Sequence, residues 1–235
     1  MAKRKEDKVT RIRNAILASS AIVVVIVIGY GTLYSTGVTQ SGTFVEGTHY
    51  TSVDNPQRRR PTDPIVVTEF FSYGCIHCKN FDPLLDDWLP TLPEDVVFNR
   101  SPVTFSPAWA ILGQSYLALE SAGALEANHR RIFRAIHDNR RQFISADMVA
   151  DFVDGRGISK DEFLKAYNSS AVRRALANGD ARQRSFAIAS VPTLVVAGKY
   201  IVSMDVGRPQ VLDVVDHLIA LERNERQTQA AEGRL

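Results

Sequence analysis

The only two cysteines of the chain are separated by two residues, in Cys75-Ile76-His77-Cys78. Such a pair can exchange disulfides, bind a metal, form a structural disulfide, or consist of two unrelated core cysteines. Tetrahedral zinc needs about four ligands, but there is no second cysteine pair and the other histidines are scattered. A disulfide between residues this close adds little chain-entropy stabilisation. The pattern therefore favours redox chemistry and predicts no metal site.

The residues around the pair predict how it is positioned. Residues 65–71 are rich in β-branched and aromatic side chains, and 79–89 have apolar side chains at helical spacing. Cys75 is therefore expected at a helix N-terminus, where free backbone N–H groups and the helix dipole stabilise a thiolate. Protonated His77 would add a second favourable charge. We interpret Cys75 as the nucleophile and Cys78, one turn later, as the buried resolving thiol.

The charge distribution argues against nucleic-acid binding. The net charge is +2, but residues 1–13 hold six basic and two acidic side chains, which leaves −2 for the remainder. A net charge of −2 after residue 13 does not favour binding to a polyanion, so no nucleic-acid partner is expected.

The N-terminal region has the features of a membrane anchor. No charged residue occurs from Asn14 to Val45, and 15–34 are apolar enough for a helix of about 30 Å. We predict a basic cytoplasmic tail over 1–13 and a transmembrane signal anchor over 14–35. A cleaved signal is the alternative, although Ser35-Thr36-Gly37 is a poor cleavage site. In both cases the body reaches an oxidising compartment, where disulfides persist.

The residues after the N-terminal region form the body of the protein, and their pattern predicts an α/β sheet domain with a helical insertion. After a flexible linker over 36–43, strands are expected over 44–53, 65–71 and from 96 to about 104. Strands return over 193–196 and 200–202, and a last helix begins at Pro209. The sheet domain is assigned to 44–105 and 190–225, the insertion to 106–189, and a polar, frayed tail to 226–235.

Helix-capping patterns mark the insertion. Ser106 followed by Pro107 predicts the start of a helix that ends at Gly123. Further helices are expected over 125–136, from a cap at Ser145 to residue 155, from a capping box at 159–162, and over 171–188.

Several motifs in this order resemble the thioredoxin superfamily and, within it, the bacterial DsbA-type disulfide oxidoreductases. The resemblance covers about residues 44–222. It rests on three segments: 69–72 leading into the cysteine pair, Ala108-Trp109-Ala110, and Val191-Pro192 followed by Gly198-Lys199-Tyr200. It implies a thioredoxin-like sheet domain with an inserted helical subdomain, here preceded by one N-terminal transmembrane helix.

The resemblance also assigns roles to single residues. Val191-Pro192 matches the family's cis-proline loop, whose backbone pairs with substrate beside the disulfide; an ordinary strand-initial proline is the alternative. Glu69 matches a buried acid that exchanges a proton with Cys78, with a raised pKa; the alternative is a solvent-facing side chain. Substrate is expected to contact Ile76 as well as Val191 and Pro192.

Other positions around the site carry less information. Asp82 and Arg100 resemble further charged positions of the family. Ile76 is a departure, since many of the best-known members have proline there. The residues between the cysteines tune the thiolate, so this change leaves the oxidising strength open. A retained membrane anchor is a second departure, since the usual form of the family is soluble.

The resemblance implies an enzyme that introduces disulfides into unfolded or reduced exported proteins at the periplasmic face of a bacterial inner membrane. Reoxidation would come from a quinone-linked DsbB-type membrane protein, and no organic cofactor is implied. One alternative is a reductase or isomerase kept reduced by a membrane partner. The other is a tethered peptide-binding chaperone, whose activity would survive replacement of Cys75 by serine.

Overall fold

The computed structural model describes residues 44–54, Pro56 and 60–232, together with Asn14, Leu17 and Ser19. The predicted anchor over 14–35 therefore lies almost wholly outside the described residues, as do the basic tail and the linker. Among the residues that are described, no helix is long and apolar enough to span a bilayer. The anchor stays a prediction.

A five-stranded sheet forms the centre of the body. The strands are β1 (Tyr50–Ser52), β2 (Ile65–Phe71), β3 (Val96–Pro102), β4 (Thr193–Val196) and β5 (Tyr200–Val202), in the spatial order β1-β5-β4-β2-β3. The central strand β2 pairs in parallel with β3 and antiparallel with β4. Its register places Glu69 opposite Arg100 on one side and Leu194 on the other. Residues directly opposite share a sheet face, so Glu69 and Arg100 are brought together.

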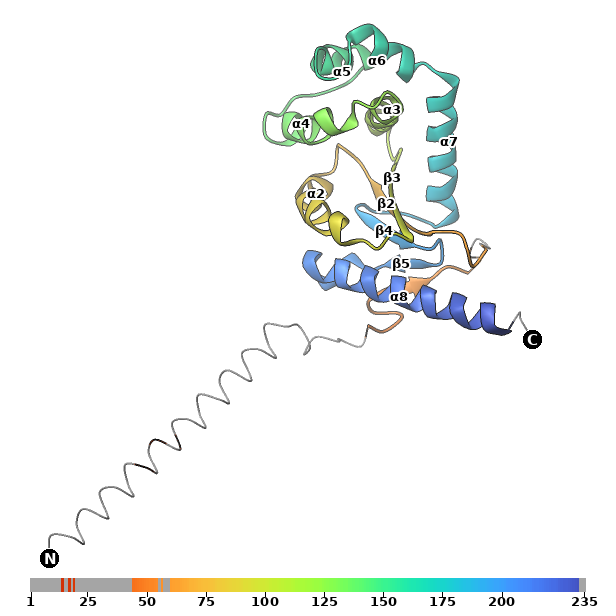
Figure 1. Cartoon of the computed structure of the whole chain (residues 1–235). Coiled ribbons are helices and arrows are strands. Elements are labelled where there is room, and N and C mark those ends of the chain that lie inside the picture. Colours follow the sequence, from red (N-terminus) through yellow and green to blue (C-terminus); the bar gives the residue numbers. More distant parts are fainter. Residues whose placement is uncertain are drawn as a thin grey trace, which may run out of the picture. The chain divides into compact units, whose positions relative to one another are not determined.

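Helices cover the sheet and extend beyond one end of it (Figure 1). The active-site helix α2 (Ile76–Trp88) contacts α8 (Arg208–Glu232), which packs on β4 and β5. Between β3 and β4 the chain forms α3 (Pro107–Ser121), α4 (Leu125–His137), α5 (Ala146–Val153), α6 (Lys160–Tyr167) and α7 (Ser170–Ser185). Two short 3₁₀ turns, η1 (Leu89–Thr91) and η2 (Met204–Val206), complete the set. Figure 1 shows α2 and α7 on opposite sides of the strands.

The predicted helix caps are confirmed. The Ser106 side chain accepts a hydrogen bond from the backbone N–H of Trp109, and Ser145 caps α5 in the same way. Ser159 and Glu162 form the reciprocal capping box of α6. Each serine satisfies a backbone donor that the first helical turn leaves without a partner, which fixes where the helix begins.

Two large apolar clusters lie on the two sides of the active-site helix α2. One joins the sheet to α2 and α8, with Val67, Phe81 and Leu218 fully buried. The other fills the helical insertion and includes both Cys75 and Cys78. The active-site loop is therefore packed between the sheet domain and the insertion, so both parts position it.

Two element boundaries differ from the prediction by three residues or more. The first strand covers only Tyr50–Ser52, because residues before it form a turn with Gly47 at φ +84°. The Val45 N–H donates to Nδ1 of His49 in this turn, at 3.0 Å. Helix α7 ends at Ser185 rather than 188, since Ala187 adopts φ +50°, which a right-handed helix does not allow.

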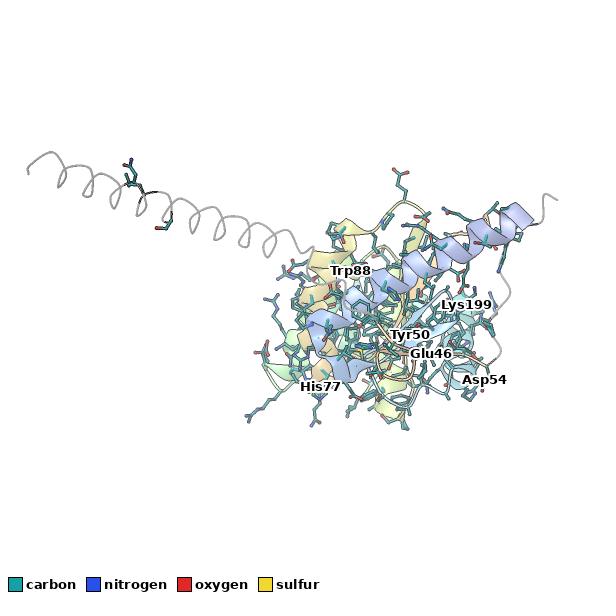
Figure 2. All side chains as sticks on the ribbon, turned by 90° about the horizontal axis from the view of Figure 1, so that it is seen from below. Glu46, Tyr50, Asp54, His77, Trp88 and Lys199 are labelled. Carbon is teal, nitrogen blue, oxygen red and sulfur yellow. The ribbon has the colours of Figure 1, made fainter. Side chains whose placement is uncertain are left out.

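The expectation of a frayed tail over 226–235 is wrong for the described residues, since α8 continues to Glu232. Its polar side chains are anchored. Buried Glu222 accepts from Arg226 Nε at 2.7 Å and pairs with Lys199. Glu225 accepts from Lys199 Nζ at 3.0 Å and from the Tyr200 hydroxyl at 2.9 Å. Figure 2 shows Lys199 beside α8. The ion pairs with Lys199 and the hydrogen bond from Tyr200 come from β5 and its preceding turn, so the local sequence of the tail does not reveal them.

Candidate active site

Cys75 is the N-cap residue of α2, as predicted. Its backbone is extended (φ −99°, ψ 117°), and its Sγ accepts a hydrogen bond from the backbone N–H of Cys78 at 3.4 Å. Both cysteines are free thiols in this structure. Cys75 is 7% exposed and Cys78 only 1%. The first cysteine can therefore be approached from solvent, whereas the second is enclosed.

The two thiols differ strongly in acidity. A hydrogen bond from the Cys78 thiol is the largest factor lowering the pKa of Cys75, and it outweighs burial. Backbone N–H groups of Cys78 and His77 lower it further, so that the pKa falls to about 6. Burial raises the pKa of Cys78 well above its ordinary value, and the interactions with Cys75 and Glu69 act in the same direction. A single thiolate on Cys75 is thus the favoured anion of the reduced pair.

The Val191–Pro192 peptide bond is cis, and the loop faces the cysteine pair. The Cys75 thiol donates a hydrogen bond to the Val191 carbonyl oxygen at 3.3 Å. Pro192 is buried and Val191 is half-buried. The expected juxtaposition of this loop and Cys75 is therefore present.

The two residues between the cysteines lie at the surface. Ile76 is 43% exposed, and His77 is exposed on the same turn of α2 (Figure 2). The charge of His77 lowers the pKa of Cys75 less than the hydrogen bonds from Cys78 and from the backbone N–H of His77 do. Its backbone N–H contributes more than its imidazole.

An apolar surface adjoins the pair. Phe105 is 41% exposed and stacks on Trp109, with ring centroids 5.6 Å apart. A Cβ atom on Gly74 would lie 2.5 Å from Nε1 of Trp109, closer than van der Waals contact permits. Only glycine fits between the cysteine and this indole, which explains the residue type at position 74.

Glu69 is buried beneath the pair, and the solvent-facing alternative is wrong. It is 2% exposed, and its Oε2 pairs with Arg100 Nε at 2.8 Å. Burial raises the pKa of Glu69 to about 7, even though the Arg100 charge and hydrogen bond lower it. A carboxyl with such a pKa can give or take a proton near neutral pH.

The Arg100 guanidinium links Glu69 to a second buried acid. Its Nη2 donates to Oδ1 of Asp82 at 2.9 Å, and the same oxygen lies 2.9 Å from Nε2 of His129. Burial disfavours ionisation of Asp82, but the bond from His129 and the Arg100 charge outweigh it and lower its pKa. Asp82 is thus an ionised acceptor, so we assign the His129 proton to Nε2.

Two histidines of α4 hold the active-site loop, and sequence reasoning missed both. The Tyr73 hydroxyl donates to Nδ1 of His129 at 2.8 Å. Nε2 of His137 donates to the Tyr73 carbonyl oxygen at 2.9 Å. One signal was available: His129 shares a helix face with Ile132 and Phe133, so a polar group on the buried face was to be expected.

No group of His, Cys, Asp and Glu in the described part of the chain has an arrangement that could hold a metal ion. The cysteine pair, with the cis-proline loop beside it and a buried acid nearby, has a geometry suited to thiol–disulfide exchange.

Comparisons with known proteins agree with this geometry. The family model of the DSBA-like thioredoxin domain matches residues 66–218. The thiol:disulfide interchange protein DsbA of Pseudomonas aeruginosa is 35% identical over 188 residues, covering 78% of this chain and 88% of the relative. The protein of the same name from Azotobacter vinelandii is 41% identical over 162 residues, covering 68% of this chain and 76% of the relative.

Solved structures have the same fold. The crystal structure of Pseudomonas aeruginosa DsbA superimposes with a TM-score of 0.75 at 33% identity, covering 80% of this chain and 98% of that one. The oxidoreductase DsbA from Xylella fastidiosa gives a TM-score of 0.72 at 29% identity, covering 77% and 98%. The chain belongs to the DSBA-like thioredoxin domain family and is a thiol:disulfide oxidoreductase that catalyses thiol–disulfide exchange.

Proposed function

We propose that this oxidoreductase works as an oxidase, which introduces disulfides into exported proteins through Cys75 and Cys78. The proposal rests on the difference in acidity between the two thiols. The pKa of Cys75 is lowered to about 6, whereas that of Cys78 is raised. A stabilised Cys75 thiolate favours the reduced enzyme. The disulfide form is then a strong acceptor of two electrons.

The exchange proceeds in two steps. A substrate thiolate attacks Cys75 Sγ, a mixed disulfide forms, and the Cys75–Cys78 bond breaks with its electron pair on Cys78. The second substrate thiolate then attacks the substrate sulfur of the mixed disulfide and releases Cys75 as a thiolate. The substrate loses two electrons and two protons, and the enzyme disulfide is reduced. The low pKa of Cys75 makes it a good leaving group in the second step.

Glu69 acts in the first step as the proton donor to Cys78. The leaving Cys78 thiolate is unfavourable in its buried position and must be protonated. Glu69 is buried below the pair, and its pKa of about 7 leaves a large protonated fraction at neutral pH. During reoxidation Glu69 would take the proton back.

The surface around Cys75 binds the substrate chain. The Val191 backbone, next to Cys75 and held by Pro192, pairs with an extended substrate segment. Exposed Ile76 contacts apolar substrate side chains. His77 assists as a nearby positive charge, in addition to its backbone N–H.

We further infer that the enzyme is a single-pass protein of a bacterial inner membrane, with the catalytic body in the periplasm. The support is the charge-free, apolar segment over 14–35 behind a basic tail over 1–13. A linker over 36–43 leads to the sheet domain, 44–105 and 190–225, with 106–189 as its insertion. By family resemblance, a quinone-linked DsbB-type membrane protein reoxidises the cysteine pair.

Trapping the thiols in intact cells tests the oxidase function. A maleimide reagent that adds mass separates reduced from oxidised enzyme on gels, and Cys75→Ser provides the unlinked control. An oxidase is mostly disulfide-bonded at steady state. A pair found mostly reduced would instead support the reductase or isomerase alternative. Activity that survives in Cys75→Ser would support the chaperone alternative.

A further inference from the structure

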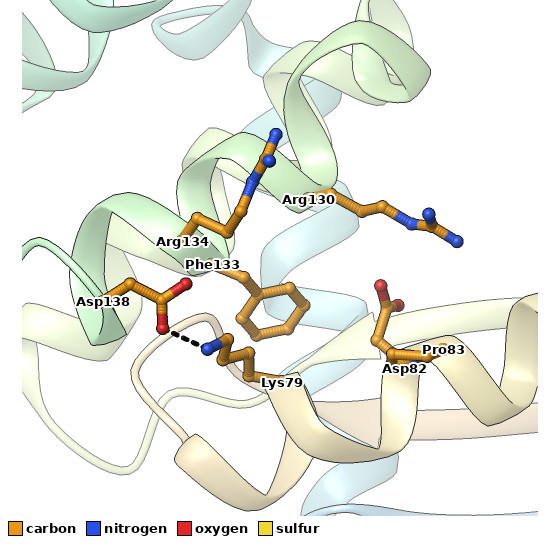
Figure 3. Close-up of a pocket in the computed structure, with 7 residues that line it drawn as sticks. All are labelled: Lys79, Asp82, Pro83, Arg130, Phe133, Arg134 and Asp138. Atoms are coloured by element: carbon orange, nitrogen blue, oxygen red, sulfur yellow. Dashed lines mark hydrogen bonds and ion pairs between the residues drawn. The ribbon is translucent and has the colours of Figure 1, made fainter.

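A pocket lies beside the active-site helix, between α2 and α4. Its volume is about 350 Å³, and it is lined by Lys79, Asp82, Pro83, Arg130, Phe133, Arg134 and Asp138 (Figure 3). The lining begins with the residue that follows Cys78. Phe133 is 3% exposed and forms a recessed apolar part of the wall. The pocket is thus a neighbour of the cysteine pair and separate from the Val191–Pro192 loop.

Within the described part of the chain, the charged side chains that line this pocket are paired except for one. Asp82 is held by Arg100 and His129. Lys79 pairs with Asp138, and Arg130 pairs with Asp86. Arg134 is exposed, and no carboxylate among the described residues pairs with it. Figure 3 shows the Arg134 side chain reaching out from α4 above the pocket. One cation at the rim is therefore available to an external anion.

Further cations adjoin Arg134 on the outer side of α4. The Arg131 guanidinium lies 4.7 Å from the Phe152 ring centroid and donates to Oδ1 of Asn128 at 2.7 Å. Burial, and then the positive charges of Arg156 and Arg134, lower the pKa of Arg131. Like charges are thus gathered here, on a body whose charge beyond residue 13 is −2. Such crowding costs free energy that an anionic partner would relieve.

We propose that Arg134, at the rim of this pocket, anchors a docking site for an acidic segment of the proteins that exchange disulfides with Cys75. A carboxylate of that segment pairs with Arg134, and an apolar side chain enters against Phe133. A hollow with a recessed apolar wall suits an inserted side chain better than a flat bilayer surface. Because Lys79 directly follows Cys78, a docked segment stays close to the reacting sulfur. This proposal rests on the oxidase function proposed above and names a class of its substrates.

Two synthetic peptides test the docking site. Each carries the same cysteine pair, followed by a run of Glu in one and of Gln in the other. The full-length oxidised protein in neutral detergent should oxidise the Glu peptide with the higher kcat/KM. Since an exposed ion pair contributes little, Arg134→Gln should lower that value by about two- to five-fold. It should leave the Gln peptide unchanged. Added salt should remove the preference for Glu.

Arg174→Gln serves as the matched control, because Arg174 is an exposed arginine on α7, away from the pocket. It should not alter the preference. Equal rates for both peptides with the unchanged protein would overturn the proposal, as would an equal loss for both peptides in Arg134→Gln. If Arg134→Gln instead weakens only binding to micelles doped with phosphatidylglycerol, the surface binds lipid headgroups and the proposal is wrong.

A binding measurement separates this proposal from the oxidase function. Fluorescence anisotropy with cysteine-free versions of both peptides reports docking without any chemistry. If neither cysteine peptide is oxidised, the oxidase function fails. Preferential binding of the acidic peptide, lost in Arg134→Gln, would then still support the docking site, whereas equal binding of both would reject it.

Discussion

Replacing Cys78 with alanine should raise the pKa of Cys75, because it removes the thiol whose hydrogen bond contributes most to the lowering. In the unchanged protein this pKa is about 6, against an ordinary value of 9.0. Cys75 is then roughly nine-tenths thiolate at pH 7, whereas an ordinary thiol would be about one-hundredth. Alanine keeps the backbone N–H of residue 78, so part of the lowering should remain.

The low pKa of Cys75 favours its release as a leaving group more than its attack as a nucleophile. Thiolate nucleophilicity falls with pKa, with a Brønsted slope of about 0.4–0.5, so a three-unit decrease slows each thiolate by roughly 20–30-fold. The roughly 90-fold larger thiolate fraction therefore leaves a net gain of only about three- to five-fold in attack at pH 7. The same decrease in pKa speeds the release of Cys75 from the mixed disulfide, and the loss of nucleophilicity does not affect that step.

Alkylation by iodoacetamide as a function of pH measures the effect in the reduced full-length protein. We expect a midpoint near pH 6 for the unchanged protein and a clearly higher midpoint for Cys78→Ala. Cys78→Ser is the matched control, because its hydroxyl can still donate to Cys75, and its midpoint should stay below that of the alanine variant. A midpoint near the ordinary thiol value before any substitution would refute the reasoning. So would identical midpoints in the alanine variant and the unchanged protein.

Three further substitutions probe the same site. His77→Ser should raise the pKa of Cys75 by less than Cys78→Ala does, in the same alkylation assay; an equal or larger rise would contradict the minor role of the imidazole. Glu69→Gln should flatten the dependence of stability on pH, measured by urea unfolding. Because folding raises the pKa of Glu69 from 4.5 to about 7, its contribution is fully present below pH 4.5 and is lost as the pH rises through 7. Over this pH range the contribution of Glu69 to the free energy of unfolding changes by at most about 3 kcal/mol. If Glu69→Gln depends on pH as steeply as the unchanged protein, Glu69 is not the source of this dependence. Gly74→Ala should displace Trp109, shift its fluorescence and destabilise the fold by about 1–3 kcal/mol; an unchanged emission spectrum would show that the loop accommodates the methyl group.

Local signals made the position of Cys75 predictable. A strand ending before the pair and helical spacing after it place the first cysteine at a helix N-terminus, and the structure confirms this cap. Serine caps in the insertion were predictable for the same reason, since each depends on contacts within one turn. The burial of Glu69 could not be predicted from such local signals, because the alternation of side chains along β2 does not say which face of the sheet is covered.

Long-range packing explains what the sequence did not reveal. His129 meets Asp82 across 47 residues and Tyr73 across 56, through the packing of α4 on α2 and the active-site loop. Neither spacing resembles a known motif. The same holds for the end of α8, where Lys199 and Tyr200 reach Glu225 from a distant turn.

The modest effect of His77 follows from helix geometry. Residues two apart on a helix point away from each other, whereas residues three apart lie on the same face. Cys78 is three residues after Cys75 and supplies both a thiol and a backbone donor to its sulfur, whereas His77 is two residues after it and faces solvent. The closeness of His77 to Cys75 in the sequence therefore led us to overestimate how much its imidazole lowers the pKa of Cys75. Exposed side chains between the cysteines are well placed to meet a substrate, so we propose that Ile76 and His77 share a role at the contact surface.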